Sequence, residues 1–272
     1  MKVMINGLPG NVAVILAGHI TRDDRFELVP FSLTGPEITA SEHRVGDATV
    51  ALVRPEDKND RIRQIIAKYG AFISVDFTHP SAVNDNARFY CANHLPFVMG
   101  TTGGDRAALV KTVETSSNTA VIAPNMAKQI VGLQAMLEFA AQTFPALFEG
   151  YTLSVKESHQ SGKADTSGTA KALVKSFNDL GVDFSADQIE MERNPETQSK
   201  KWGIPRAYLG GHGWHTYSLL SPDKTVRFEF THNVNGREVY AHGTLDAVVF
   251  LAGKIKAGVT GRVFSMTDVL QG

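Results

Sequence analysis

Cysteine is almost absent from this chain, since Cys91 is the only one, and no apolar run is long enough to cross a membrane. A lone cysteine excludes an intrachain disulfide and a multi-cysteine metal site, and it fits a reducing compartment. A membrane-spanning helix needs about 20 predominantly apolar residues in succession, so we expect no membrane span. Net charge is also nearly absent, at −1, which leaves no basic surface for nucleic acid or anionic lipid. We therefore expect neither a nucleic-acid partner nor a membrane partner.

We also expect no N-terminal leader. A strand-like pattern begins at residues 2–5, which leaves no room for a signal or transit peptide. Together with the single cysteine, this pattern predicts a cytoplasmic protein. The length of 272 residues allows one large domain or two of medium size.

The first 125 residues alternate short β-branched runs with amphipathic stretches, which predicts a parallel sheet with crossover helices. We expect strands at residues 3–5, 27–33, 72–76, 97–99 and 120–122, and helices at residues 12–19, 62–69, 81–93, 105–116 and 130–144. This alternation is typical of a Rossmann-like, doubly wound α/β domain.

After residue 147 the pattern changes to longer alternating strands, expected at residues 151–157, 215–220 and 225–234. This change predicts a second, α+β domain with an open, mostly antiparallel sheet. A helical pattern at residues 240–256 is expected to pack on the first domain, and the polar stretch 183–201 is expected to form a surface connection. The predicted domain bounds are 1–127 together with 239–272, and 128–238.

A turn with two glycines separates the first expected strand from its helix, and residues 7–13 read Gly-Leu-Pro-Gly-Asn-Val-Ala. A dinucleotide site needs a tight turn, close backbone approach to the pyrophosphate, and a small residue where the helix meets the sheet. Gly7, Gly10 and Ala13 can fill these roles, although Pro9 stands where the usual pattern has its middle glycine. A plain turn remains the alternative interpretation.

The end of the second expected strand carries no acid, since residues 31–35 read Phe-Ser-Leu-Thr-Gly. An Asp or Glu at this place normally binds the ribose hydroxyls in NAD-selective enzymes. Ser32 and Thr34 instead leave space for a 2′-phosphate, which favours NADPH. No arginine stands in this loop to make the preference strong, so NADH remains a second cofactor.

The segment 157–170 concentrates groups that can carry chemistry. His159 and Lys163 are four residues apart, and residues 166–169 have the composition of a helix start. Helix N-termini have free N–H groups and a partial positive charge, so they bind carboxylates and phosphates. A proton donor, a cation and an anion cradle predict a substrate site for a small carboxylic acid. The alternative is a solvated loop followed by a capped helix, and Glu157 is taken as an ordinary charge without a role.

Three further loops follow expected strands, where open α/β sheets place their ligands. They are Asp-Phe-Thr-His-Pro at 76–80, Gly-Thr-Thr-Gly at 100–103 and Ala-Pro-Asn-Met at 123–126. With the Glu-x-His-x-x-x-Lys-x-Asp-x-Ser-Gly-Thr-Ala segment at 157–170, the whole chain resembles the dihydrodipicolinate (4-hydroxy-tetrahydrodipicolinate) reductase family. Ser-His-Gln at 158–160, Lys-Gln at 128–129 and the run 212–217 are similar to its plant-type branch.

The resemblance implies NAD(P)H-dependent reduction of 4-hydroxy-tetrahydrodipicolinate to tetrahydrodipicolinate, in diaminopimelate and lysine biosynthesis. It implies that the first domain binds the dinucleotide and that the second binds a small dicarboxylate substrate and assembles a homotetramer. By the same resemblance His159 donates the proton and Lys163 binds a carboxylate or the charged intermediate. The expected substrate contacts are Gln160, Ser167, Gly168 and Thr169. The common bacterial form has a second histidine where this chain has Gln160, and its following loop is one residue longer.

The residues that the resemblance assigns to the cofactor are Gly7, Leu8, Pro9, Gly10, Asn11, Val12, Ser32, Thr34, Phe77, Thr78, Gly100, Thr101, Thr102, Ala123, Pro124, Asn125 and Met126. The remaining histidines show no metal-ligand spacing along the chain, so no metal is expected. Two other functions stay open. One is a two-domain oxidoreductase of the aspartate or homoserine dehydrogenase type, and the other is a non-catalytic sensor that binds NADP.

Overall fold

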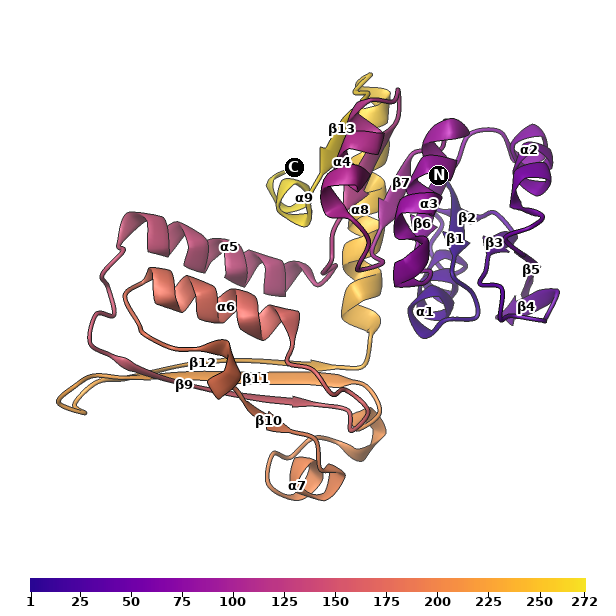
Figure 1. The fold of residues 1–272 in the computed structure, drawn as a ribbon. Coiled ribbons are helices and arrows are strands. Elements are labelled where there is room, and N and C mark those ends of the chain that lie inside the picture. Colours follow the sequence, from indigo (N-terminus) through magenta and orange to yellow (C-terminus); the bar gives the residue numbers. More distant parts are fainter. The chain divides into compact units, whose positions relative to one another are not determined.

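The computed structural model describes residues 1–272 and separates the chain into two compact units (Figure 1). Unit 1 comprises Met1–Lys128 and Glu238–Gly272, and unit 2 comprises Gln129–Arg237. Each unit has its own sheets and its own buried apolar cluster. The expected combination of a Rossmann-like fold and a second, mostly antiparallel α+β fold is confirmed.

Unit 1 is built on a six-stranded parallel sheet with the order β13-β8-β7-β6-β1-β2. Its strands are β1 (Lys2–Asn6), β2 (Glu27–Leu28), β6 (Ile73–Asp76), β7 (Phe97–Met99), β8 (Thr119–Ile122) and β13 (Arg262–Phe264). The inner strands β6, β7 and β8 are buried along their whole length, as parallel strands covered on both faces must be.

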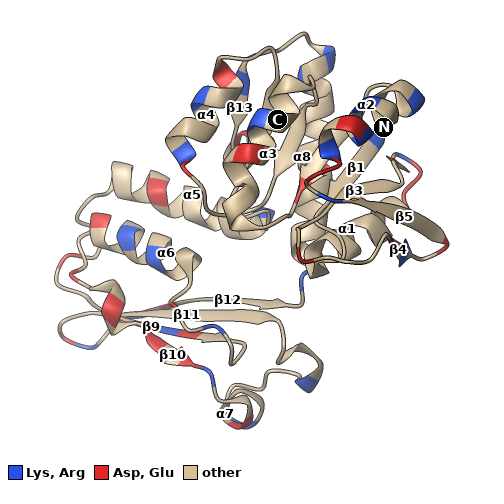
Figure 2. Ribbon diagram, turned by 45° about the vertical axis from the view of Figure 1, so that its right-hand side comes forward, with Lys and Arg blue, Asp and Glu red and all other residues tan.

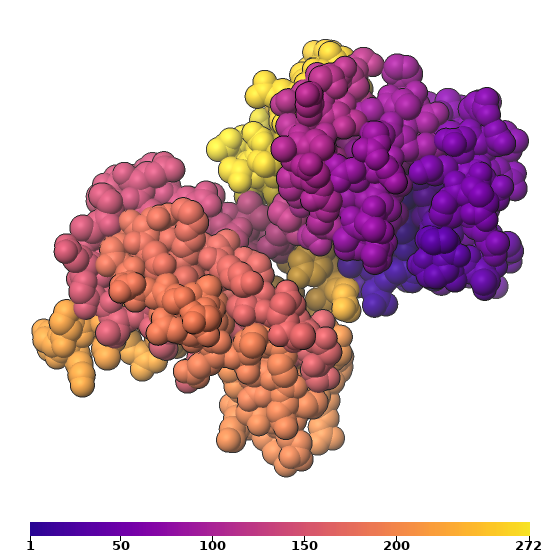
Figure 3. All heavy atoms as spheres, in the orientation of Figure 1, coloured from indigo at the N-terminus to yellow at the C-terminus, as the bar shows by residue number.

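Helices cover both faces of this sheet. The helices of unit 1 are α1 (Asn11–Ile20), α2 (Lys58–Tyr69), α3 (Val83–Ala92), α4 (Arg106–Glu114), α8 (Glu238–Lys256) and α9 (Met266–Gln271), with a 3-10 turn η1 at Pro80–Ala82. α8 packs against α1 and the inner strands, whereas α3 and α4 pack together on the other face (Figure 1). The C-terminal residues, yellow in Figure 3, lie against unit 1.

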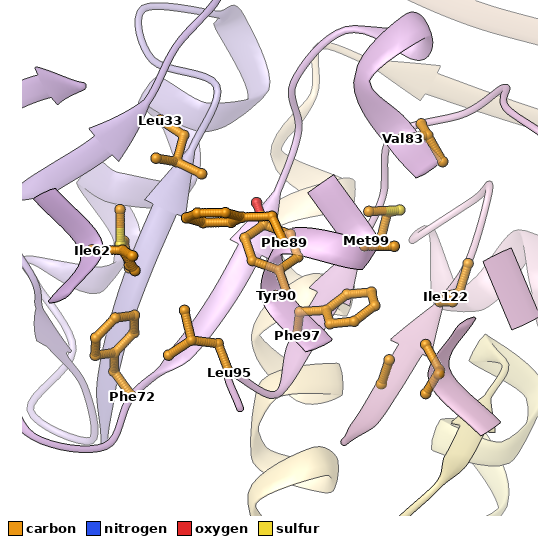
Figure 4. Packing of buried hydrophobic residues seen from close by; sticks show 14 of the residues in the cluster. Leu33, Ile62, Phe72, Val83, Phe89, Tyr90, Leu95, Phe97, Met99 and Ile122 are labelled. Carbon is orange, nitrogen blue, oxygen red and sulfur yellow. The ribbon is translucent and has the colours of Figure 1, made fainter. Parts of the chain in front are cut away.

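An apolar cluster of unit 1 lies between the sheet and the α3–α4 layer and extends to α2. Phe97 and Met99 of β7 point to this layer, and Tyr90 of α3 packs against Phe97 with ring centroids 5.2 Å apart (Figure 4). Tyr90 is fully buried, and its hydroxyl reaches the end of β6. The packing of Tyr90 therefore places its hydroxyl at the carboxyl end of β6. This is the edge at which open α/β sheets usually bind their ligands.

The prediction of a single strand at residues 27–33 is wrong, because the chain passes from one sheet to another at Pro30. Val29 N–H still bonds to β1, but Pro30 has no N–H, so the ladder with β1 ends there. The next residues form a separate three-stranded sheet of β3 (Phe31–Leu33), β4 (Glu42–Val45) and β5 (Ala48–Val53) in the order β3-β5-β4. The sequence analysis did not predict β4 or β5.

Unit 2 is a four-stranded sheet with the order β10-β9-β11-β12. β9 (Thr152–His159), β11 (His212–Leu220) and β12 (Arg227–Asn235) are antiparallel, and β10 (Glu190–Glu192), red in Figure 2, runs parallel to β9. Helices α5 (Lys128–Thr143) and α6 (Gly168–Asp179) cover one face. The buried cluster joins Leu153 and Val155 of β9 to Leu173 and Phe177 of α6.

The polar stretch 183–201 is more than the surface connection expected for it. It contains the 3-10 turn η2 (Ala186–Gln188), the strand β10 and the helix α7 (Pro195–Lys200). A second 3-10 turn, η3 (Arg206–Tyr208), follows it. Gln198 of α7 is fully buried, and its amide donates to the His159 carbonyl oxygen at 2.7 Å. These short elements are held by such tertiary hydrogen bonds, which local propensity does not encode.

Charged side chains of both signs are interspersed along the helices and loops of the two units (Figure 2). This mixture agrees with the net charge of −1. No helix in the structure combines the length and the apolar character that crossing a bilayer requires.

Candidate functional site

The turn between β1 and α1 has two glycines that no other residue can replace without strain. Gly7 has φ +108°, and a Cβ on it would lie 2.2 Å from the Phe77 carbonyl oxygen. A Cβ on Gly10 would lie 2.8 Å from the Gly7 carbonyl oxygen. The Gly10 N–H donates to that same oxygen at 2.8 Å, so the turn is closed on itself. Asn11 and Val12 then begin α1, as expected from the sequence.

Ser32 of β3 and Thr34, the residue after this strand, hold the turn in place. The Leu8 N–H donates to the Ser32 hydroxyl at 3.2 Å, and the Thr34 hydroxyl donates to the Leu8 carbonyl oxygen at 2.8 Å. Both residues are buried, and Ser32 is completely so. Their hydroxyls are therefore engaged with the turn.

A cavity of about 850 Å³ lies beside the turn, within the size range of ligand pockets. Of the residues expected at the cofactor, those that line the cavity are Gly7, Leu8, Pro9, Gly10, Thr34, Phe77 and Thr78. Three charged residues that were not expected at the cofactor, Glu37, Lys58 and Asp85, also line it. Glu37 lies just beyond the segment searched for an acid, and Lys58 starts a helix that tertiary packing brings to the cavity.

Asn11 and Val12 of α1 and Ser32 of β3 do not line this cavity, and neither do the expected cofactor residues that follow β7 and β8. Gly100 is packed so closely that a Cβ on it would be 2.3 Å from the Phe77 ring. Thr101 is buried and Thr102 is exposed. Ala123, Pro124, Asn125 and Met126 follow β8, and the Asn125 side chain accepts from the Ala127 N–H at 2.9 Å.

Asp76, the last residue of β6, joins the loops at this edge of the sheet. Its buried carboxylate accepts five hydrogen bonds, two from Thr78 and one each from Asn86, Tyr90 and Thr101. The distances are between 2.6 and 3.1 Å. All five donors are uncharged. Burial, together with the nearby Asp76, raises the pKa of Tyr90 well above its usual range, so its phenol stays protonated.

On the helix-covered face of the unit 2 sheet, the side chains change from apolar to polar toward one end. There the register places His215 of β11 between Glu157 of β9 and His232 of β12, and these three side chains form a polar row across the sheet. Because side chains alternate between faces, this row continues the buried face that carries Val155 and Tyr217. Glu157 has no exposed surface and the His159 side chain is 12% exposed, so the row opens to solvent at His159.

Glu157 is the charged centre of this row. Its Oε1 accepts from Arg193 Nη2 at 2.5 Å, and its Oε2 accepts from the Ser167 N–H at 3.0 Å. Burial would raise the pKa of Glu157, but hydrogen bonds from His215, Arg193 and Ser167 outweigh burial and lower the pKa to about 2. Glu157 is therefore a carboxylate at neutral pH, and taking it as a charge without a role missed the residue that organises the site.

His159 makes a hydrogen-bond contact through each of its ring nitrogens. Its Nδ1 is 3.0 Å from the His212 carbonyl oxygen, and its Nε2 is 3.3 Å from His215 Nε2. A carbonyl oxygen only accepts, so Nδ1 carries a hydrogen and Nε2 holds the lone pair in the neutral ring. Burial and the neighbouring His215 lower the pKa of His159 to about 4, against the opposite influence of Glu157. The ring is neutral at pH 7 in the protein without substrate.

Lys163 belongs to a turn that Arg193 holds. Lys163 N–H donates to the Gln160 carbonyl oxygen at 3.0 Å, and Arg193 Nε donates to the Lys163 carbonyl oxygen at 2.8 Å. Arg193 Nη2 reaches the Asp165 carbonyl oxygen at 3.3 Å. The Lys163 ammonium pairs with the exposed Asp165 carboxylate at 2.6 Å. One guanidinium thus connects this turn to Glu157.

The start of α6 stands next to the same turn. Ser167 is its N-cap, but no side chain caps the free N–H groups of the first turn. Gly168 is exposed, and a Cβ on it would meet nothing within 4 Å. Gly168 and Thr169 therefore begin a helix whose first turn is open to an anion.

The sequence analysis missed Arg193, Gln198, His212 and His215. The histidines had a detectable signal, because His215 alternates with Tyr217 and Leu219 on the buried face of β11. Arg193 had none, because it comes from the stretch expected to be a surface connection. His212 accepts or donates at the Ser158 hydroxyl, 2.9 Å away, and thereby joins β9 to β11.

Comparisons with known proteins cover the whole chain. The profile "Dihydrodipicolinate reductase, N-terminus" matches residues 1–126, and "Dihydrodipicolinate reductase, C-terminus" matches residues 130–270. The chain is 45% identical to 4-hydroxy-tetrahydrodipicolinate reductase 2, chloroplastic, of Arabidopsis thaliana, covering 100% of this chain and 77% of the relative. It is 42% identical to the probable 4-hydroxy-tetrahydrodipicolinate reductase 2, chloroplastic, of Oryza sativa subsp. japonica, covering 99% and 82%.

Among solved structures, the dipicolinate-bound dihydrodipicolinate reductase from Paenisporosarcina sp. TG-14 superposes with a TM-score of 0.65. The sequences are 17% identical, and the match covers 97% of each chain. This likeness is one of fold. It agrees with the parallel sheet of unit 1 and the mostly antiparallel sheet of unit 2.

These relatives correct the prediction of a cytoplasmic protein. Four plant relatives at 42–45% identity are named chloroplastic, and their similarity contradicts that assignment. A single cysteine and a strand near residue 2 describe the folded part of the chain, and neither is specific to one reducing compartment. The matches to both family profiles, together with the plant relatives, show that this chain belongs to the dihydrodipicolinate reductase family, whose members reduce 4-hydroxy-tetrahydrodipicolinate with a nicotinamide cofactor in diaminopimelate and lysine biosynthesis.

Proposed function

We propose that this chain performs the family's reduction with His159 as the proton donor and Lys163 as a ligand of a substrate carboxylate. One observation carries this assignment. The Arg193 guanidinium bonds both to Glu157, which lies beside the His159–His215 pair, and to the carbonyl oxygen of Lys163. A single buried ion pair therefore sets the position of the proton donor relative to the cation.

Reduction adds a hydride and a proton to the substrate. A reduced nicotinamide supplies the hydride when it is bound, so the chain has to place the dicarboxylate and deliver the proton. Nδ1 of His159 is committed to the His212 carbonyl oxygen. The transferable proton therefore leaves from Nε2, and the ring must first be charged.

The dicarboxylate itself helps to charge His159. Burial holds the pKa of the ring at about 4 in the free protein, so His159 is neutral before substrate binds. Two substrate carboxylates add negative charge near the ring, and a nearby negative charge raises the pKa of a histidine. The Glu157 carboxylate, 4.0 Å from His159 Nε2, acts in the same direction. We infer that proton uptake by His159 accompanies substrate binding.

Lys163, Gln160, Ser167, Gly168 and Thr169 form the proposed carboxylate ligands. The present partner of Lys163, Asp165, is exposed, and solvent screens such an ion pair so strongly that it contributes little. Exchanging Asp165 for a substrate carboxylate therefore costs little. A second carboxylate fits the uncapped first turn of α6. The Ser167 N–H is already bonded to Glu157, so Gly168 and Thr169 are the main N–H donors in this proposal.

For the cofactor we propose the cavity of unit 1 and the turn at residues 7–12. Gly7 and Gly10 leave room for a close backbone approach of the pyrophosphate, and the 850 Å³ cavity fits part of a dinucleotide. Lys58 provides a cation for a 2′-phosphate, whereas the Glu37 carboxylate suits free ribose hydroxyls. We therefore propose NADPH as the preferred cofactor and NADH as an alternative.

The family resemblance also motivates a homotetramer assembled through the sheet of unit 2. Helices α5 and α6 cover one face of this sheet. The other face, which is proposed to meet the other chains, carries Ser154, Lys156, Thr216 and Thr231. Sedimentation equilibrium of the purified chain decides this proposal, because a mass of one or two chains would contradict it.

The reaction is tested directly by supplying aspartate semialdehyde, pyruvate and a dihydrodipicolinate synthase and following the loss of NADPH. We expect loss that depends on both precursors and on this chain. An NADP-binding sensor would bind NADPH without consuming it. A dehydrogenase of the aspartate or homoserine type would act on its own substrate without the synthase, and either outcome would refute the proposal.

A further inference from the structure

Three side chains at the open end of the unit 2 row direct ligand atoms at one point. His159 Nε2 is 3.3 Å from His215 Nε2, Glu157 Oε2 is 3.7 Å from His215 Nε2, and it is 4.0 Å from His159 Nε2. No other group of His, Cys, Asp and Glu residues in the chain meets in this way. A point equidistant from three atoms with these separations is about 2.1 Å from each, which is the length of a zinc–nitrogen bond.

The hydrogen bonds of His159 and Glu157 also suit a metal. His159 donates its Nδ1–H to a backbone carbonyl, the arrangement that usually orients a metal-binding histidine and leaves its Nε2 lone pair free. Arg193 holds Oε1 of Glu157, while Oε2, which also accepts from the Ser167 N–H, faces the two histidines. Without a metal, only one proton can lie between the two Nε2 atoms. A single proton therefore satisfies only part of the three ligand atoms that converge there.

We propose that Glu157, His159 and His215 bind a zinc ion with an open fourth position, and that zinc bound there inhibits the reductase by occupying the proton-donating atom of His159. The binding stands on the geometry of unit 2 alone, whereas the inhibition rests on the proposed function of His159. Two imidazoles and one carboxylate are a common ligand set of zinc sites with an open position. Magnesium and calcium prefer oxygen ligands only.

The same surroundings indicate that binding is reversible. The Arg193 guanidinium shares the Glu157 carboxylate and opposes a second positive charge. When His215 binds a metal through Nε2, its hydrogen moves to Nδ1, which is buried without a partner. His159 is partly exposed, so an ion can enter and leave. These properties fit an inhibitory site more than a structural one.

The ligand atoms come from two strands, which explains why the sequence predicted no metal. Glu157 and His159 are neighbours on one face of β9, but His215 follows more than fifty residues later on β11. Only the antiparallel register brings it opposite Glu157. No spacing along the chain announces such a site.

The test is a titration of the full-length protein with Co²⁺, followed by competition with Zn²⁺. We expect one equivalent of Co²⁺ to produce the strong visible absorption of four-coordinate cobalt and Zn²⁺ to abolish it. His215→Gln should weaken the affinity at least about tenfold. His232→Gln is the matched control, because its ring stacks on His215 at 4.5 Å but is outside the ligand group. It should bind metal within about twofold of wild type, the scatter expected of a residue that makes no metal contact.

Absence of the cobalt spectrum in the wild type, or equal weakening by the two substitutions, would overturn the site. A second assay tests inhibition with substrate formed beforehand, so that the synthase is not exposed to zinc. Zn²⁺ should slow NADPH loss, and a chelator should restore it. Metal binding without inhibition would contradict the second part of the proposal. Metal binding by a chain that never oxidises NADPH would retain the site and refute the proposed function instead.

Discussion

Two buried carboxylates organise the two units, and they differ in what surrounds them. Asp76 in unit 1 accepts hydrogen bonds from Thr78, Asn86, Tyr90 and Thr101, all of which are neutral. Glu157 in unit 2 faces a guanidinium and two imidazoles. Neutral donors can satisfy a carboxylate, but at neutral pH they do not exchange protons with it.

This difference indicates that the Asp76 network positions the loops of unit 1, whereas the Glu157 network takes part in the proposed chemistry. The Asp76 network ties the loops after β6 and β7 together and contains no histidine, lysine or arginine, so its role is to hold shape. The Glu157 network contains histidines and connects to the turn of Lys163. We therefore expect substitutions around Glu157 to affect both stability and catalysis, and substitutions around Asp76 to affect mainly stability and cofactor binding.

The largest expected effect follows removal of the Glu157 partner. Arg193→Met leaves a buried carboxylate without its cation, and breaking a buried pair in this way costs about 3–5 kcal/mol of unfolding free energy. Denaturant titration of the full chain measures it. Arg193→Lys retains the charge but loses the fork that also binds the Lys163 carbonyl oxygen, so its loss should be smaller. A methionine variant as stable as wild type would show that the pair is dispensable.

His159→Gln should sharpen the contrast from the catalytic side. Removing a general acid typically lowers turnover by about a hundredfold or more. The Michaelis constant for substrate should change much less, because the lost interaction belongs to the transition state. Steady-state kinetics and a thermal melt are measured together, and the melting temperature should fall much less than in Arg193→Met, because His159 is partly exposed and uncharged. Near wild-type turnover would remove His159 as the donor.

Lys163→Ala should reduce both turnover and substrate affinity. Loss of one charge-assisted contact to a carboxylate costs about 1.5–3 kcal/mol, which appears in kcat/KM. Asp165→Asn is the matched control, since it removes the present partner of Lys163 but keeps the cation. Its kcat/KM should equal or exceed that of wild type. If Lys163→Ala changes only thermal stability, Lys163 is a structural residue.

Asp76→Asn should act through shape. In the variant, the amide NH₂ replaces a carboxylate oxygen that accepts from donors such as Asn86 and Tyr90, so N–H groups face donors and one or two hydrogen bonds are lost. We expect this loss to cost about 1–3 kcal/mol of unfolding free energy. We expect a higher Michaelis constant for the cofactor and almost unchanged turnover at saturation. A large loss of turnover at saturating cofactor would erase the distinction between the two carboxylates.

The smallest effect is expected at the cofactor cavity. Lys58→Met removes the cation proposed to meet the 2′-phosphate and should weaken NADPH about tenfold, or about 1.4 kcal/mol, with NADH unaffected. Glu37→Gln removes a carboxylate from the same cavity and should not weaken NADPH. Calorimetric titration of both cofactors against both variants measures this. Equal loss of NADPH and NADH in Lys58→Met would mean that Lys58 does not contact the phosphate.

Much of the fold follows from local patterns. Buried runs such as Ile73–Asp76 and Thr119–Ile122 identify parallel strands, because a strand covered on both faces has no polar alternation. The change of sheet at Pro30 was missed, although proline was a usable signal there. β10 and α7 were missed because tertiary hydrogen bonds, such as that from Gln198 to His159, hold these short elements.

For the site, the order of residues was enough to identify the chemical groups of one segment. His159, Lys163 and the start of α6 lie within a few residues of one another, so composition and helix signals were sufficient. The tertiary structure alone decided their surroundings. Arg193 and His215 reach Glu157 only through the parallel pairing of β10 and the antiparallel pairing of β11 with β9. Register and burial are long-range properties, and they turn an ordinary glutamate into the centre of the site because a buried charge must find its partners wherever the fold places them.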